Sequence, residues 1–171
     1  MDPDLFNLSG LEEPQSEESK SENSEISMAE LLEQLYEDIS SMVNNEETDS
    51  QSVEVAWFTG EKVRKVLGFI QGSPKAPEAF KELMKHLEEI TKGKITPDNT
   101  LDYVRFAETF PDIQIVSRLS EQLNLEHFLL ISALDDDLHR VFYSEKCFSE
   151  NWTCDELTKA IKDQLFESEY K

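Results

Sequence analysis

Apolar residues recur at three- and four-residue steps from about residue 27 to residue 165 of this chain. This spacing places them on one face of an α-helix. S/T-x-x-E capping boxes begin the first and last periodic segments, at Ser27 and Thr153, and prolines and glycines separate the others. The predicted helices are 27–43, 53–70, 77–90, 97–110, 113–122, 125–134, 137–149 and 153–165. No alternating strand pattern exceeds four residues, so the pattern predicts an all-α fold with a single multi-helix bundle.

Two of the predicted helices, 77–90 and 97–110, are joined by a very short connection. Gly93 lies in this connection and is suited to end the first helix. Thr96 followed by Pro97 is a favourable N-cap and first-turn pair for the second helix. Two helices joined by a short glycine-containing turn indicate a helix-turn-helix-like pair within the bundle.

The acidic residues are distributed unevenly. Residues 1–53 hold fifteen Asp and Glu against one Lys, which is −14 of the formal net charge of −21. Residues 1–25 are rich in Ser and Glu and have too few apolar groups to offset the entropy of ordering the backbone. We expect a disordered acidic tail over residues 1–25 and one helical domain over residues 26–171. Apolar tail residues that lie among the acids are expected to bind a protein partner, with a solubilising tail as the alternative: Leu5, Phe6, Leu8 and Leu11.

Several function classes are not supported by the sequence. It has neither a basic-then-apolar leader nor a run of about 18 apolar residues, so we expect no signal peptide and no membrane span. Cys147 and Cys154 are the only cysteines and have no second Cys/His pair at zinc spacing, which predicts reduced thiols in the cytoplasm and no metal ion. His127 stands in an apolar segment, where a packing histidine is expected and no nucleophile partner is evident. We therefore expect no catalysis, no cofactor and no small-molecule substrate.

An ordered set of residues carries a more specific signal. Asn99, Arg105 and Phe106 are followed by the aromatic–proline pair Phe110–Pro111. A Trp-x-x-Gly motif, Trp57 and Gly60, stands upstream of these residues. Downstream, the set continues with Leu123, His127, Phe128, Arg140, Phe142, Tyr143, Trp152, Thr153, Glu156, Leu157 and Ile161. Over approximately residues 36–166 the set resembles the helix-turn-helix-type domain that precedes the nuclease domain in bacterial YhcG-like proteins of the PD-(D/E)XK class.

This resemblance implies DNA as a partner, and the chain is also similar to the central domain of ParB-type partition proteins. By analogy, helix 97–110 would meet the major groove. The candidate nucleic-acid contacts are Thr96, Asn99, Thr100, Tyr103 and Arg105. Charge opposes this reading, because four carboxylates in 97–112 face Arg105 alone, and carboxylates near phosphates weaken electrostatic affinity. These carboxylates belong to Asp98, Asp102, Glu108 and Asp112.

The leading hypothesis is a non-enzymatic, DNA-associated helix-turn-helix-like module. It would be a stand-alone relative of the nuclease-associated domain, since the sequence ends at Lys171, where the family's nuclease would begin. The alternative is an acidic protein-interaction adaptor or DNA-mimicking inhibitor that engages a basic protein partner. A basic set upstream of residue 97 would form either a local phosphate-facing patch or an ordinary mixed surface: Lys62, Arg64, Lys65, Lys81, Lys85, Lys92 and Lys94.

Overall fold

The computed structural model describes residues 27–45 and 52–170, and within these ranges the chain is helical without a strand. Its helices are α1 (Met28–Asn44), α2 (Val53–Ile70), α3 (Ala76–Ile90), α4 (Pro97–Thr109), α5 (Ile113–Leu119), α6 (Leu125–Ser132), α7 (Asp137–Glu150), α8 (Cys154–Lys162) and α9 (Leu165–Glu169). The all-α prediction is confirmed. The predicted tail and its residues Leu5, Phe6, Leu8 and Leu11 lie outside the described residues.

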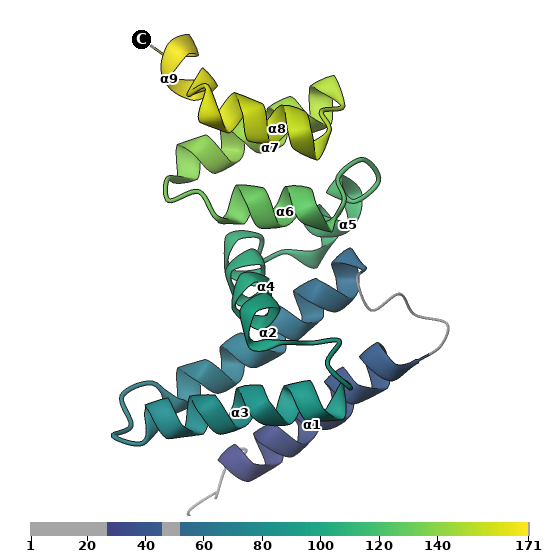
Figure 1. The fold of residues 1–171 in the computed structure, drawn as a ribbon, viewed down its shortest axis with the longest axis vertical. Coiled ribbons are helices and arrows are strands. Elements are labelled where there is room, and N and C mark those ends of the chain that lie inside the picture. The colour runs from purple at the N-terminus through teal and green to yellow at the C-terminus, as the bar shows by residue number, and fades with distance from the viewer. Residues whose placement is uncertain (1–26, 46–51, 171) are drawn as a thin grey trace, which may run out of the picture.

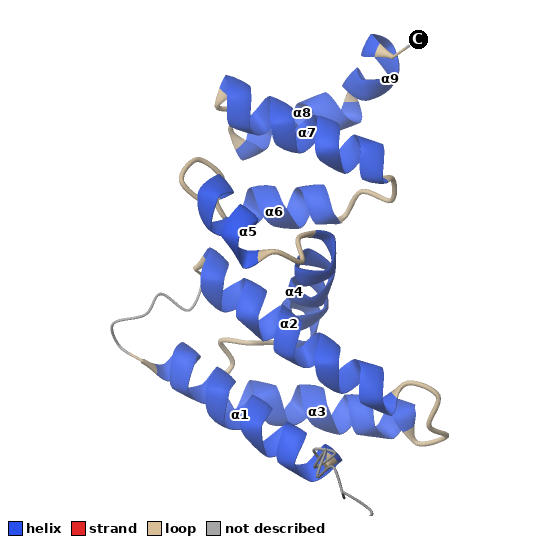
Figure 2. Ribbon diagram, turned by 180° about the vertical axis from the view of Figure 1, so that it is seen from behind, coloured by secondary structure: helices blue, strands red, loops and turns tan. Residues whose placement is uncertain are grey.

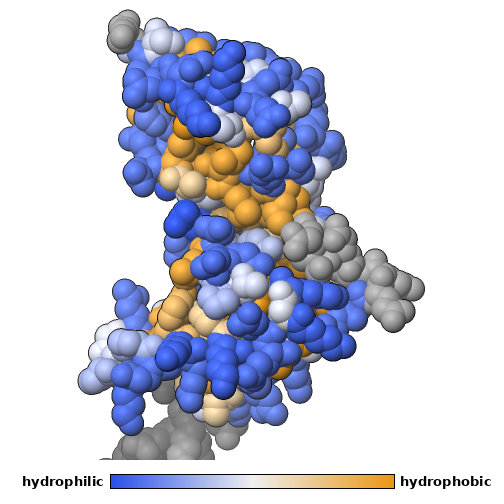
Figure 3. All heavy atoms as spheres, viewed as in Figure 1, coloured by the Kyte–Doolittle hydropathy of each residue, from blue (hydrophilic) through white to orange (hydrophobic). Residues whose placement is uncertain are grey.

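The helices form an elongated bundle with α4 near its middle (Figure 1). Helices α1, α2 and α3 make up one end, and α7, α8 and α9 make up the other, where the C-terminus lies (Figures 1 and 2). One buried cluster runs through both ends and includes Ile39, Val63, Phe106, Phe128 and Leu157, each with 0% exposed area. On the face shown in Figure 3, apolar residues gather across the level of α6, between two mostly polar ends.

Helices α2 and α4 cross at very short range. A Cβ atom added to Gly60 would lie 1.9 Å from the Tyr103 carbonyl oxygen, so only glycine allows this approach. One turn earlier in α2, Trp57 Nε1 donates a hydrogen bond of 2.7 Å to the Phe110 carbonyl oxygen. The Trp-x-x-Gly motif therefore joins α2 to both the middle and the end of α4.

The helix starts follow the predicted caps closely. Ser27 and Thr153 form their capping boxes with Glu30 and Glu156, as predicted. At the end of α3, Gly93 has a φ of 77° and donates its N–H to the Glu88 carbonyl oxygen at 2.8 Å, which completes a Schellman-type stop.

The prediction of one uninterrupted last helix was wrong. The chain turns at Gln164, whose φ of 52° is left-handed, and α9 then runs in a new direction. The new course packs the Phe166 ring at steep angles against His139 and Phe142 of α7, at centroid distances of 4.2 and 5.4 Å. The Tyr143 hydroxyl also accepts the Phe166 N–H at 3.4 Å. Tertiary packing on α7 has overridden the helical period of the sequence.

Candidate functional site

The helix-turn-helix-like pair consists of α3, the connection 91–96 and α4. Thr91 organises the connection from inside, because its buried hydroxyl donates to the Leu87 carbonyl oxygen at 2.6 Å and accepts the Ile95 N–H at 3.1 Å. Ile95 is fully buried and ties the turn to the core. The backbone entering α4 is therefore held by the core rather than by the surface.

Thr96 and Asn99 form the cap of α4. The Thr96 hydroxyl accepts the Asn99 N–H at 3.4 Å, and Asn99 Oδ1 accepts the Thr96 N–H at 2.7 Å. The Asn99 amide also donates to the Lys94 carbonyl oxygen at 3.2 Å. Both side chains are thus used in starting the helix, and sequence reasoning had assigned only Thr96 to this role.

Thr100 and Tyr103 face the core. Their exposed fractions are 0% and 2%, and the Thr100 hydroxyl donates to the Thr96 carbonyl oxygen at 2.7 Å. Burial, together with the nearby Asp102 carboxylate, raises the pKa of the Tyr103 phenol. In this structure neither side chain reaches the protein surface, so both residues pack beneath α4 and their predicted contact with a nucleic acid stays a prediction.

Arg105 is the one candidate contact that is placed on the open face of α4. Its side chain is 51% exposed and makes a loose ion pair with Asp102, at 3.5 Å. Asp98 and Glu108 share this exposed face. The Arg105 side chain is therefore accessible to a phosphate group, and the surface around it is acidic overall.

Most of the basic set upstream is already paired. Among the described residues, only Lys81 and Lys92 of this set make neither an ion pair nor a side-chain hydrogen bond. The other partners are Asp38 for Lys62, Glu61 for Arg64 and Lys65, Glu89 for Lys85, and the Val43 carbonyl oxygen for Lys94. This pairing favours the mixed-surface interpretation over a phosphate-facing patch.

The downstream motif residues join helices to one another. His127 is 4% exposed, and its Nε2 donates to the Trp152 carbonyl oxygen at 2.8 Å, which links α6 to the start of α8. Arg140 Nε donates to the Leu134 carbonyl oxygen at 2.8 Å. The Tyr143 hydroxyl donates to the Ala160 carbonyl oxygen at 3.3 Å. The prediction of a packing histidine at position 127 is confirmed.

The structure also brings a thiol to His127 that sequence reasoning missed. Cys154 Sγ lies 3.3 Å from His127 Nδ1 and 3.4 Å from Asn124 Oδ1, although 27 residues separate the cysteine from the histidine. Burial, followed by the Glu126 carboxylate, raises the pKa of the Cys154 thiol. The thiol is therefore a hydrogen-bond donor at neutral pH and lacks the lowered pKa of a cysteine nucleophile. No local sequence signal pointed to this contact, because Asn124 and His127 belong to the start of α6 and Cys154 to α8.

A comparison with protein families covers nearly the whole described chain. The family model of the DUF1016 N-terminal domain matches residues 27–168. The chain belongs to this family. The DUF1016 N-terminal domain is the N-terminal domain of YhcG-like nuclease-family proteins, so the resemblance read from the sequence is confirmed. No curated protein and no solved structure matches the chain.

Most of the motif residues have structural roles in this DUF1016 N-terminal domain. They cap helices, fill the core or link one helix to the next, as Asn99, Phe106 and His127 do. Arg105 differs, since its weak pair with Asp102 contributes little to the fold. Within the described ranges, no group of three or more His, Cys, Asp or Glu side chains is arranged to hold a metal ion, and no helix has the length and hydropathy needed to cross a membrane.

Proposed function

We propose that this domain is a non-enzymatic, DNA-associated module that acts as part of a DNA-bound complex. Family membership over residues 27–168 carries the proposal, because it places the chain with the N-terminal domain of a nuclease family. The α3–α4 pair supports it with a capped second helix and an exposed arginine, which is the group best suited to grip a phosphate.

The contribution of this domain to DNA affinity is expected to be small. Asp98 and Glu108 lie on the same exposed face as Arg105, and like charges oppose the approach of the phosphate backbone. The described residues also offer few unpaired cations near α4. The domain is therefore proposed to position or regulate a complex whose main DNA affinity comes from another component.

A gel retardation series with short duplex DNA at about 50 mM salt tests the DNA contact, because electrostatic affinity is greatest at low salt. Arg105→Ala is the diagnostic variant. Arg118→Ala is the matched control, since it removes the same charge from an exposed position on α5. We expect weak retardation that Arg105→Ala lowers and Arg118→Ala leaves nearly unchanged. No retardation of the wild-type protein would reject direct contact, and equal effects of the two variants would reject Arg105 as its site.

A further inference from the structure

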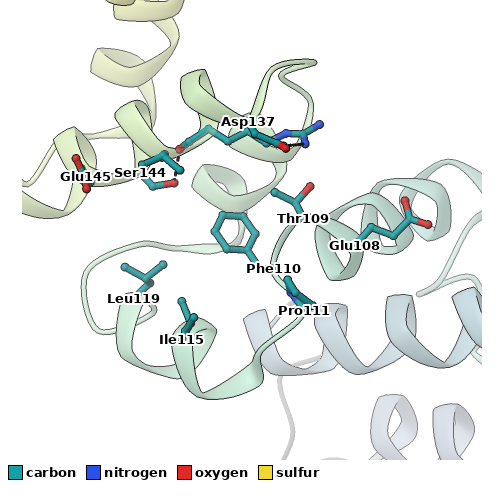
Figure 4. Close-up of a pocket in the computed structure, with 11 residues that line it drawn as sticks. Glu108, Thr109, Phe110, Pro111, Ile115, Leu119, Asp137, Ser144 and Glu145 are labelled. Atoms are coloured by element: carbon teal, nitrogen blue, oxygen red, sulfur yellow. Dashed lines mark hydrogen bonds and ion pairs between the residues drawn. The ribbon is translucent and has the colours of Figure 1, made fainter.

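A groove with an apolar floor opens between α5 and α7 at the C-terminal end of α4. Its volume is about 490 Å³. Figure 4 shows Phe110 between the two walls, with Ile115 and Leu119 on the α5 side and Ser144 and Glu145 on the α7 side. The Trp57 hydrogen bond to the Phe110 carbonyl oxygen holds this floor in place. The groove is therefore built on a fixed backbone.

Two aliphatic side chains of the groove are left largely in water. Ile115 is 51% exposed and Val141 is 56% exposed, on opposite walls. The neighbouring Leu138 of α7 is 68% exposed. Neither wall is covered by another described segment. An apolar surface of this kind, bordered by polar residues, is typical of a site for a protein segment.

The rim of the groove is acidic. Glu108 stands at one edge and Glu145 at another, and neither forms an ion pair with a described residue. Arg140 is the only cation among the lining residues, and it is already engaged by the Asp137 carboxylate at 2.7 Å and the Leu134 carbonyl oxygen. The carboxylates of Glu108 and Glu145 therefore give the rim a negative charge, which favours a positively charged occupant.

We propose that this groove binds a cationic amphipathic helix of a partner protein, which places aliphatic side chains between Ile115 and Val141 and basic side chains beside Glu108 and Glu145. The formal net charge of −21 adds long-range attraction for such a segment. The same charge repels a second copy of this chain. Anionic lipid is repelled as well, and the −14 carried by residues 26–171 (29 acidic against 15 basic residues) repels the chain's own acidic residues 1–25.

The binding test uses a labelled leucine–lysine peptide of about 14 residues, which is roughly four helical turns. Fluorescence anisotropy is measured with the full chain at about 150 mM salt, where the screening length is about 8 Å and distant charges contribute little. A leucine–glutamate peptide and a serine–lysine peptide of the same spacing serve as controls. We expect only the leucine–lysine peptide to bind tightly. No binding of that peptide, or equal binding of either control peptide, would overturn the proposal.

Variants locate the bound peptide. The double variant Ile115→Ser with Val141→Ser should weaken binding by about tenfold, because it removes apolar area at exposed positions. Leu101→Ser is the matched control, since Leu101 is an exposed aliphatic residue of α4 outside the groove, and it should leave binding unchanged. Glu108→Gln with Glu145→Gln should weaken binding several-fold, whereas Glu78→Gln on α3 should not. Circular dichroism confirms that each variant keeps its helicity.

The other occupants give distinct results. Methyl NMR of Ile115 and Val141 should be the same with and without residues 1–26; a change on deletion would assign the groove to the chain's own N-terminal segment and overturn the proposal. Sedimentation should show a monomer; a dimer that the double variant dissociates would assign the groove to a second copy and also overturn it. Peptide binding involves no DNA, so its outcome is independent of the gel retardation result.

Discussion

Gly60 of α2 and Tyr103 of α4 meet backbone to backbone. The space for a Cβ at residue 60 is occupied by the Tyr103 carbonyl oxygen, 1.9 Å away. The close crossing leaves Tyr103 2% exposed and brings Trp57 within hydrogen-bonding distance of the Phe110 carbonyl oxygen. This glycine therefore allows the close α2–α4 crossing, beside which Trp57 holds the Phe110 backbone at the floor of the groove.

Gly60→Ala should destabilise the protein by about 3 kcal/mol, because the added methyl group forces α2 and α4 apart against backbone atoms. Urea denaturation followed by circular dichroism measures this change. Gly68→Ala is the matched control on the same helix. A Cβ atom added at residue 68 would meet no atom within 4 Å. This substitution should therefore stabilise the protein by about 0.5–1 kcal/mol through helix propensity. Equal effects of the two variants would contradict the close crossing.

The start of α8 should depend on pH through Glu156. Hydrogen bonds from the Thr153 N–H and hydroxyl hold the pKa of this carboxyl below its usual value of 4.5. Its contribution to stability is thus fully present above pH 4.5 and is lost as the pH falls through the lower, folded-state pKa. Hydrogen exchange of the first-turn amides of α8 should show this loss on acidification.

Glu156→Gln provides the internal comparison, because Gln keeps the capping geometry without a titrating carboxyl. First-turn protection in this variant should vary less between pH 5 and pH 3 than in the wild type; these are approximate limits around the usual Glu pKa. Asp155→Asn leaves the capping box intact and should retain the wild-type dependence. Identical pH profiles for Glu156→Gln and the wild type would disprove the link to this residue.

Both thiols should react slowly while the protein is folded. Burial raises the pKa of Cys147 to about 12 and also raises the pKa of Cys154, which lies closer to the surface. At pH 8 the thiolate that reacts with iodoacetamide is therefore scarce at both positions. Mass spectrometry should find slower alkylation of Cys154 than in urea, and still slower alkylation of the fully buried Cys147.

Glu126→Gln should accelerate alkylation of Cys154, because the Glu126 carboxylate is the largest raising influence on this thiol after burial. Asp155→Asn should accelerate it less, since the influence of Asp155 is smaller. Rapid alkylation of Cys154 in the folded wild-type protein at neutral pH would contradict these assignments and identify the Cys154–His127 pair as a reactive one.

Local sequence signals predicted the helix starts well. Capping needs only residues three apart, so the boxes at Ser27 and Thr153 could be read directly. The break at Gln164 could not be read in this way. It is stabilised by contacts of Phe166 with α7, which lies more than 20 residues earlier in the chain. Long-range packing overrides a local period wherever it buries more surface.

The candidate site shows the same division. Helix periodicity places Thr100, Tyr103 and Arg105 on α4, but three neighbouring helices, α2, α3 and α6, decide which of them are covered. Covering two of them leaves Arg105 as the exposed candidate, and DNA contact by any of these residues stays a prediction. The groove beside Phe110 is also a property of the assembled helices, because its walls come from α5 and α7.

The sequence by itself determined that this chain is helical, where most of its helices begin, and which family it resembles. These properties rest on short-range periodicity, capping and spacing, which need no partner elsewhere in the chain. The tertiary structure alone decided which face of α4 is open, that Cys154 lies beside His127, and that Ile115 and Val141 border an acidic-rimmed groove. Each of these depends on helices that are distant in sequence packing around one core, and local sequence pattern does not specify that arrangement.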